Sequence, residues 1–352
     1  MLAIGRLLLV CLLSLATASL VHADSQLRVG IALPLTGVGA PYGEAFRNGI
    51  LLGLEGHSSE IELAFEDHQY DSKSAIAAAR KLATVDSVDL IFVWGYGPSD
   101  TVAPIVASLK VPVILASLNP VSQKGGATLN FSGPLRDIVT PLAAYLKQNP
   151  DDSVAIVAAP IGSLEQSAKL LQAELPSSIL KKYETVLPDL LDFKSVITRL
   201  KIEPPSTVGL FLTPPQIKVF IEQARAQKFS PRYIGIDTFN DSSIRELFIQ
   251  ESDGPVFVDA FSDPVFVKTY EKHFGGSSHV VEAARGQLLA QLLLHVSKGF
   301  KRSTDIPVAI DSFPPGQGPA GAFSIVNSDD FGRYLATRQV LYRISKGNTV
   351  QN

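Results

Sequence analysis

The sequence predicts an α/β protein with two lobes, each built around a doubly wound parallel sheet. Short apolar runs alternate with helical patterns, and this alternation occurs in two series, at 27–116 and 154–236. The chain has 352 residues, more than a single hydrophobic core usually serves. The last part of the chain, from about residue 281, breaks the alternation. We therefore expect the chain to cross between the lobes more than once, through a multi-crossover hinge.

In the first series, buried-strand patterns alternate with amphipathic helices. Phe46, Ile50 and Leu54 recur at a spacing of four and mark one face of a helix, and alanine dominates the next helix. The expected order is strand 27–33, helix 43–54, strand 61–65, helix 74–85, strand 90–93, helix 101–109 and strand 113–116.

The second series repeats the arrangement. Its expected order is strand 154–158, helix 164–175, strand 183–186, helix 193–201, strand 208–212, helix 216–227 and strand 233–236. Because parallel neighbours need a crossover connection, which a helix supplies, these repeated units imply parallel sheets.

The remainder holds a long helix at 281–298, a turn-rich stretch at 313–319 that we expect to be irregular, and strands at 321–326 and 338–344. We assign 24–133 and 260–328 to the first lobe. The second lobe then comprises 134–259 and 329–352.

Residues 1–23 have the layout of a cleaved signal peptide. Arg6 is their only charge, an apolar region follows at 7–15, and a small-residue cleavage site precedes Asp24. An uncleaved anchor is the alternative, although the apolar stretch at 7–21 is shorter than the ~20 residues that span a bilayer. Cleavage would remove Cys11 and leave 329 residues, with 30 basic and 34 acidic side chains. The sequence thus predicts a secreted protein without disulfides.

Composition and motifs argue against several classes of function. A net charge of −3 gives no basic footprint for a nucleic-acid partner. The sequence has no Gly-x-Ser-x-Gly, His-Glu-x-x-His or P-loop motif. Its histidines, His68 among them, lack metal-ligand spacing, and we interpret them as surface or edge residues. The glycine-rich loop at 37–43 has the wrong spacing for dinucleotides, and Pro41 removes an amide donor. We therefore expect no enzyme, cofactor or metal, and interpret this loop as part of a cleft.

A recognition site is expected where the strands of the first lobe end. The segment 94–101 follows strand 90–93 and opens the next helix, so its free amides and the Ser99 hydroxyl could hold an anion. Alternatively, Ser99 or Asp100 only caps that helix. The loop at 116–120 carries Ser117 and Asn119 and should face the same crevice.

Several segments together resemble a known family. They are 28–37, Tyr42-Gly43 with Gly49, 67–71 followed by 75–82, Ala103-Pro104, 111–114, Asp192-Phe193 through 200–201, 223–225 and 318–321. In order and spacing they are similar to type I periplasmic solute-binding proteins of ABC transporters, the leucine/isoleucine/valine-binding kind. The resemblance spans nearly the whole chain after residue 23.

This resemblance implies a two-lobed clamp with three crossovers that closes on a small molecule. It places an amino acid's carboxylate on Ser99, with further contacts from Ser117 and Asn119, and the ammonium group on Asp237. Asp237 also follows strand 233–236, where a ligand would bind, although it could simply be a turn residue before the next helix.

The sequence departs from the family at positions expected in the cleft. Ser163 and Thr213 stand where family members often place large aromatics, and the first lobe instead offers Tyr42, Trp94 and Tyr96. This pattern favours an aromatic or larger polar amino acid, or a carboxylate without the amino group. Trp94 could alternatively pack beneath its loop.

The resemblance also implies partners. A monomeric binding protein would deliver its ligand to ABC permease and ATPase subunits. The alternative is a periplasmic sensing module that signals to a membrane receptor or kinase.

Overall fold

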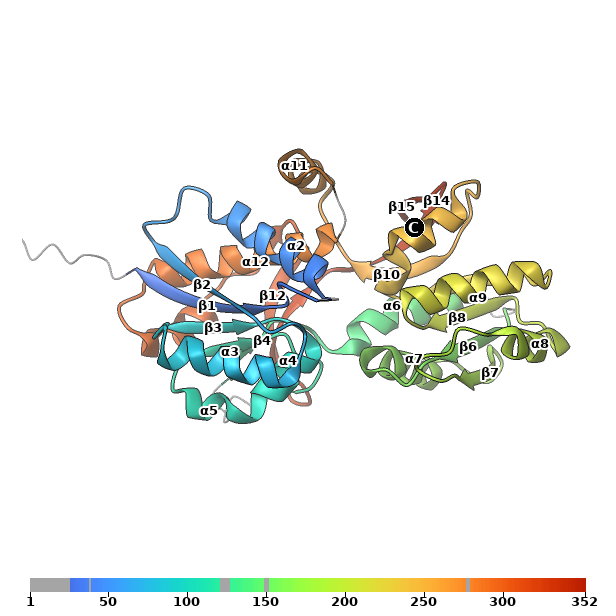
Figure 1. Cartoon of the computed structure of the whole chain (residues 1–352), viewed down its shortest axis with the longest axis horizontal. Coiled ribbons are helices and arrows are strands. Elements are labelled where there is room, and N and C mark those ends of the chain that lie inside the picture. Colours follow the sequence, from blue (N-terminus) through green and yellow to red (C-terminus); the bar gives the residue numbers. More distant parts are fainter. Residues whose placement is uncertain (1–25, 38, 121–126, 149–151, 277–278) are drawn as a thin grey trace, which may run out of the picture.

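The computed structural model describes residues 26–37, 39–120, 127–148, 152–276 and 279–352. They form two α/β lobes that lie end to end along the long axis of the molecule (Figure 1). The first sheet has eight strands in the order β11-β12-β13-β5-β4-β3-β1-β2, and the second has seven in the order β15-β14-β10-β9-β8-β6-β7. The predicted two-lobed α/β fold is therefore confirmed.

The first lobe combines an N-terminal series of elements with a later one. The first series is β1 (Leu27–Leu33), α2 (Ala40–Gly53), β2 (Ile61–Asp67), α3 (Ser72–Thr84), β3 (Leu90–Val93), α4 (Tyr96–Val102), α5 (Val106–Leu109), β4 (Val113–Leu115) and β5 (Ala127–Asn130). The later series is α11 (Pro264–Phe274), α12 (Val280–Ser297), α13 (Ile306–Asp311), β11 (Gly316–Gly318), β12 (Gly321–Ser328) and β13 (Gly332–Thr337). Strands β1 to β5 pair in parallel.

The second lobe is built from the middle of the chain and its C-terminal end. Its elements are α6 (Leu135–Lys147), β6 (Val154–Ala158), α7 (Gly162–Glu174), β7 (Leu180–Thr185), α8 (Lys194–Ile202), β8 (Thr207–Phe211), α9 (Pro214–Ala226), β9 (Arg232–Gly235), α10 (Ser242–Arg245), β10 (Val256–Ala260), β14 (Gln339–Ser345) and β15 (Asn348–Gln351). Strands β6 to β10 pair in parallel, and β14 joins β10 antiparallel.

The chain crosses between the lobes three times, after β5, after β10 and after β13. We expected the last crossing near residue 328, but it lies at Arg338, because β13 pairs with β12 and β5 and so belongs to the first sheet. The stretch expected to be irregular also contains β11, which pairs with β12. The crossing segments after β10 and after β13 are hydrogen-bonded to each other, since the amide of Phe261 donates to the carbonyl of Arg338 at 2.9 Å.

Helices cover both faces of each sheet, which accounts for the apolar runs in the strands. In the first lobe α2 and α12 cover one face, while α3, α4 and α5 cover the other (Figure 1). In the second lobe α8, α9 and α10 cover one face, and α6 and α7 cover the other.

Helices α2 and α12 pack backbone against backbone. A Cβ atom added at Gly286 would lie 2.1 Å from the carbonyl oxygen of Phe46, and one added at Gly49 would lie 1.9 Å from that of Ala283. Glycine is therefore required on both sides of the contact. This packing fixes the N-terminal end of α12 against the first sheet.

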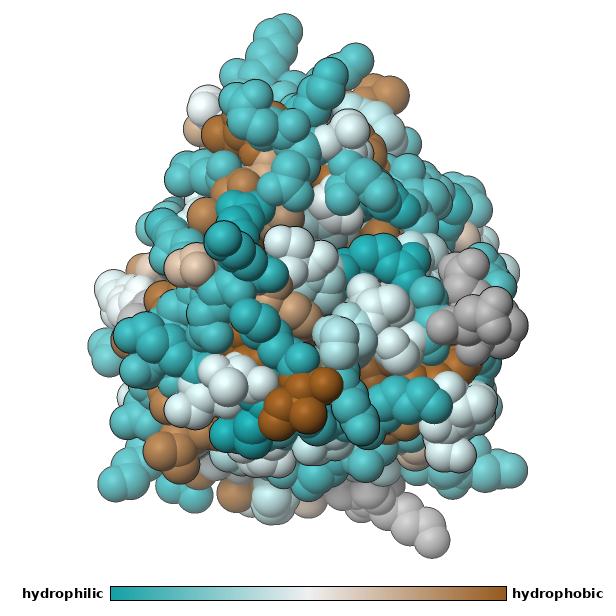
Figure 2. Space-filling view, turned by 90° about the vertical axis from the view of Figure 1, so that its right-hand side faces the viewer, coloured by the Kyte–Doolittle hydropathy of each residue, from teal (hydrophilic) through white to brown (hydrophobic). Residues whose placement is uncertain are grey.

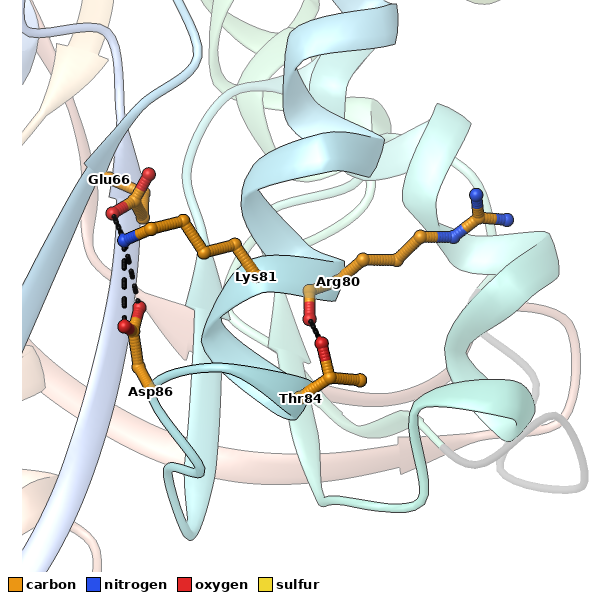
Figure 3. Close-up of polar contacts among 5 residues, drawn as sticks. All are labelled: Glu66, Arg80, Lys81, Thr84 and Asp86. Carbon is orange, nitrogen blue, oxygen red and sulfur yellow. Dashed lines mark hydrogen bonds and ion pairs between the residues drawn. The ribbon is translucent and has the colours of Figure 1, made fainter.

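The surface at the free end of the second lobe is mainly hydrophilic. The free end of the second lobe shows apolar side chains only in small separate groups (Figure 2). On the first lobe, Lys81 of α3 lies between Glu66 of β2 and Asp86, and its Nζ is 3.2 Å from Oδ2 of Asp86 (Figure 3). Such exposed pairs contribute little to stability. Among the described residues, no helix is both long and apolar enough to cross a membrane.

Candidate functional site

A cavity of about 370 Å³ lies between the lobes, at the carboxyl ends of the parallel strands. Residues of all three crossing segments line it, including Gly133, Ala260 and Thr337. A second cavity of about 540 Å³ adjoins it. The two cavities share Tyr42, Asp237, Asp259, Val281 and Glu282.

Four aromatic side chains of the first lobe form one wall of the cavity: Tyr42, Tyr70, Trp94 and Tyr96. We call this set the aromatic wall. The ring centroid of Trp94 lies 6.5 Å from that of Tyr42 and 6.0 Å from that of Tyr70. Burial raises the pKa of Tyr42 and of Tyr96 to about 12. Both phenols therefore remain protonated near neutral pH and can donate hydrogen bonds.

His68 holds two loops of this wall together. Its Nδ1 accepts the amide hydrogen of Tyr70 at 3.1 Å, so its Nε2 carries the proton and donates to the carbonyl of Trp94 at 2.9 Å. Burial lowers the pKa of His68, which keeps the ring neutral. From the sequence we interpreted His68 as a surface or edge residue. That interpretation is wrong, because the side chain is fully buried.

The loop that carries Tyr70 has an unusual backbone. Gln69 and Tyr70 have φ angles of 53° and 58°, in the left-handed region that few non-glycine residues adopt. A Cβ atom at Gly95, whose φ is 93°, would lie 2.7 Å from the Tyr70 ring. The aromatic wall therefore depends on a glycine and on two strained residues next to His68.

A charged pair on α12 completes the side of the first lobe. Nη1 of Arg285 lies 3.2 Å from Oε1 of Glu282, and Nη2 donates to the Ser132 hydroxyl at 3.2 Å. The indole nitrogen of Trp94 donates to the other Glu282 oxygen at 3.0 Å. One hydrogen-bond network thus joins the aromatic wall to the guanidinium group of Arg285. Among the described residues that line the first cavity, Arg285 is the only Lys or Arg.

Two aspartates face this network from the second lobe. Asp237 follows β9 and is exposed to the cleft, whereas Asp259 of β10 is buried and accepts from Nδ2 of Asn240 at 3.0 Å. The protein around the cleft raises the pKa of Asp237, and Glu282 raises it further. Burial also raises the pKa of Asp259, and the neighbouring charge of Asp237 adds to that shift. The protein therefore destabilises both negative charges in the cleft.

Five of the side chains singled out in the sequence line the first cavity. They are Tyr42, Trp94, Tyr96, Ser163 and Asp237. Trp94 thus faces the cavity and also packs against the core, with its ring centroid 6.5 Å from that of Phe46.

The other four, Ser99, Ser117, Asn119 and Thr213, line neither cavity. Their polar atoms form hydrogen bonds with other groups of the protein instead. The buried Ser99 hydroxyl donates to the carbonyl of Val93 at 2.9 Å and accepts the amide hydrogen of Ala116 at 3.1 Å, which ties β3 to β4. The expected carboxylate contact at Ser99 therefore does not fit this structure. Ser117 and Asn119 both bond to Asp100, and Thr213 caps α9 in a capping box with Gln216.

Sequence reasoning missed Tyr70, Asp259, Glu282 and Arg285. A signal for the last two was present, since they are the only Asp, Glu, Lys or Arg residues in the otherwise mostly apolar α12. Their spacing of three places both on one helix face. Asp259 is likewise the only charged residue of the apolar strand β10.

A family model described as a periplasmic binding protein matches residues 26–306. The chain belongs to this periplasmic binding protein family. Among curated proteins, none matches the chain.

Solved structures share the fold at low identity. The isoleucine complex of the branched-chain amino acid binding protein LivJ from Streptococcus pneumoniae is 16% identical, with a TM-score of 0.77 over 93% of this chain and 100% of that one. The leucine-binding protein LivK from Thermotoga maritima is 19% identical, with a TM-score of 0.74 over 93% and 97%. A solute-binding protein of an ABC transporter from Rhodopseudomonas palustris, in complex with 3,4-dihydroxybenzoic acid, is 20% identical, with a TM-score of 0.71 over 91% and 93%. This periplasmic binding protein therefore has the fold of ABC transporter substrate-binding proteins.

Proposed function

We propose that this periplasmic binding protein is the substrate-binding component of an ABC importer, and that it holds an amino acid or related small carboxylate between its lobes. One observation carries the proposal. The cavity places the guanidinium group of Arg285 on the first lobe and the carboxylate of Asp237 on the second. A ligand with both charges would bridge the lobes.

The two charged walls suit the two ends of an amino acid. Arg285 presents a planar fork that matches a carboxylate, and Glu282 and Ser132 hold this fork in place. Asp237 can accept hydrogen bonds from an ammonium group. In this proposal Arg285 takes the role that we first assigned to Ser99, while Asp237 keeps its expected role.

Binding would favour closure of the lobes, because only the closed form lets one ligand contact both walls. The three crossing segments would absorb the movement. The closed form would then be recognised by membrane permease subunits, with ATP hydrolysis in a partner chain. We propose a monomeric, non-enzymatic protein.

The proposed function requires a periplasmic location. The proposed signal peptide, residues 1–23, lies outside the described residues. We propose that it is cleaved during export, which would place the mature protein in the periplasm.

Ligand titration tests the function directly. Trp94 is the only tryptophan and lines the cavity, so its fluorescence should respond to binding. Melting should shift in parallel, since a ligand at a hundred times its Kd adds about 2.7 kcal/mol to stability. Arg285→Met should weaken binding of amino acids and of benzoates, whereas Asp237→Asn should weaken binding of amino acids only. If neither fluorescence nor melting responds to any amino or carboxylic acid, the proposed function is wrong.

A further inference from the structure

The charges that line the first cavity are unbalanced. Four carboxylates, those of Asp137, Asp237, Asp259 and Glu282, accompany the single guanidinium group of Arg285. Neither Asp237 nor Asp259 forms an ion pair within the described part of the chain. Their pKa values are both raised mainly because the surrounding protein disfavours the charged forms, and a neighbouring carboxylate adds to each shift, Glu282 for Asp237 and Asp237 for Asp259.

Arg285 does not correct this imbalance. Its guanidinium group already pairs with Glu282 and donates to Ser132, both on its own side of the cleft. A ligand carboxylate bound there would add one more negative charge. Within the first cavity, the two aspartates of the second lobe therefore face no spare positive charge. Arg245 and Lys268 line the adjoining cavity, together with the carboxylates of Asp241 and Glu271.

Closure of the lobes would raise the free energy of the unpaired carboxylates of Asp237 and Asp259. Asp237 is exposed to the cleft, and closure of the lobes would remove much of its contact with solvent. Two carboxylates buried without a positive partner pay a large desolvation penalty, which a positively charged ligand can offset. The α-ammonium group of an amino acid supplies one positive charge, enough for one of the two.

Asp259 is placed to take a second positive charge. It lines both cavities, as Asp237 and Tyr42 do, so the three side chains lie where the cavities join. Asp259 has one side-chain partner, the neutral amide of Asn240, together with the amide of Ala260 at 2.7 Å. The aromatic face of Tyr42 can also attract a cation. Among the described residues, no three His, Cys, Asp or Glu side chains are arranged to hold a metal ion, which favours an organic cation.

We propose that the solute carries a second positive charge besides its α-ammonium group, as a basic amino acid does, and that Asp259 holds this second charge. The proposal rests on the function proposed above and narrows its ligand class. It separates this protein from a binder of neutral amino acids or of benzoates.

A matched ligand series tests the idea on the unaltered protein. L-Lysine and L-norleucine have the same carbon chain, and only lysine has the terminal ammonium group. Cadaverine keeps both nitrogens of lysine but lacks the carboxylate, and 4-hydroxybenzoate has a carboxylate and no nitrogen. We expect titration of Trp94 fluorescence to show lysine binding at least about tenfold more tightly than norleucine, a difference of ~1.4 kcal/mol. Lysine should also bind more tightly than cadaverine, which cannot use Arg285.

The outcomes separate the two proposals. Equal affinity for lysine and norleucine, or a preference for 4-hydroxybenzoate, would overturn the second-charge proposal and leave the binding function intact. No saturable response to any of the four compounds would overturn the second-charge proposal, and the binding function would fall as well if the wider titration of amino and carboxylic acids also gave no response.

Asp259→Asn then locates the second charge. This substitution keeps the shape of the side chain, so it should reduce the preference for lysine over norleucine towards unity while norleucine affinity stays close to that of the wild type. Asp189→Asn is the control, because Asp189 is exposed on the same lobe and lines neither cavity. If the Asp259→Asn protein melts normally and still prefers lysine as strongly as the wild type, Asp259 is not the partner of the second charge.

Discussion

The contact between α2 and α12 gives a sharp prediction for Gly286→Ala. The new Cβ atom would lie 2.1 Å from the carbonyl oxygen of Phe46, where ordinary contacts begin near 3.4 Å, so the helices must separate by roughly 1 Å. Both sides of the contact are backbone, and no side chain can rotate away. Overpacking of this kind costs about 3 kcal/mol, at the upper end of its usual range, and the better helix propensity of alanine returns up to about 1 kcal/mol. We expect a net loss of about 2 kcal/mol.

Thermal melting measures this loss. A change of that size should lower the Tm by about 4–8 °C. Ligand affinity should also fall, because Glu282 and Arg285 lie at the end of α12 that the substitution displaces. Gly299→Ala is the control, since a Cβ atom there meets nothing within 4 Å. If the two variants melt at the same temperature, the helices are not packed as tightly as we infer.

Three further predictions concern the aromatic wall, pH and export. His68→Ala leaves the Tyr70 amide and the Trp94 carbonyl without their partner, so stability should fall by about 1–3 kcal/mol and Trp94 emission should shift. His57→Ala removes a half-exposed side chain that pairs with Glu60 on the surface, so it should change stability little and leave Trp94 emission unchanged. The pKa values of Asp237 and Asp259 are higher in the folded than in the unfolded protein, so their contribution to stability is present at low pH and is lost as pH rises through the folded values. Replacing both aspartates with Asn should therefore raise the Tm more at pH 8 than at pH 5. An equal rise in Tm at the two pH values would contradict the assigned pKa shifts. Mass spectrometry of the exported protein should find a chain that begins at Asp24, and retention of residues 1–23 would contradict the predicted cleavage.

The fold could be predicted from local patterns because its strands are buried on both faces. The apolar runs of β1, β3, β6 and β8 stand out for this reason. The last crossing was misplaced by about ten residues, since β13 is an ordinary strand whose sheet is decided by its pairing with β12 and β5. No local pattern carries that information.

The site was harder to predict because the same residue types serve structure and binding. Ser99 and Thr213 occupy the expected positions at strand ends, yet their hydroxyls are used within their own lobes. Asp237 was found because it lies just past the carboxyl end of β9. Arg285 was missed because α12 reaches the cleft only through its packing on α2, which the sequence does not reveal.

The split of the first lobe between two distant parts of the chain also bears on how the protein is made. When residues 1–130 have left the ribosome, α2 and the first five strands exist, but the helix that packs on Gly49 does not. The parallel strands β6 to β10 of the second lobe and their helices are synthesised in between, so this part of the second lobe could assemble before α12 is made. The core of the first lobe can be completed only after α12 has been synthesised, and such a late step between distant parts of the chain slows folding. If the chain is exported as we propose, that delay would help, because a polypeptide that cannot finish folding early stays unfolded long enough to be threaded through a membrane.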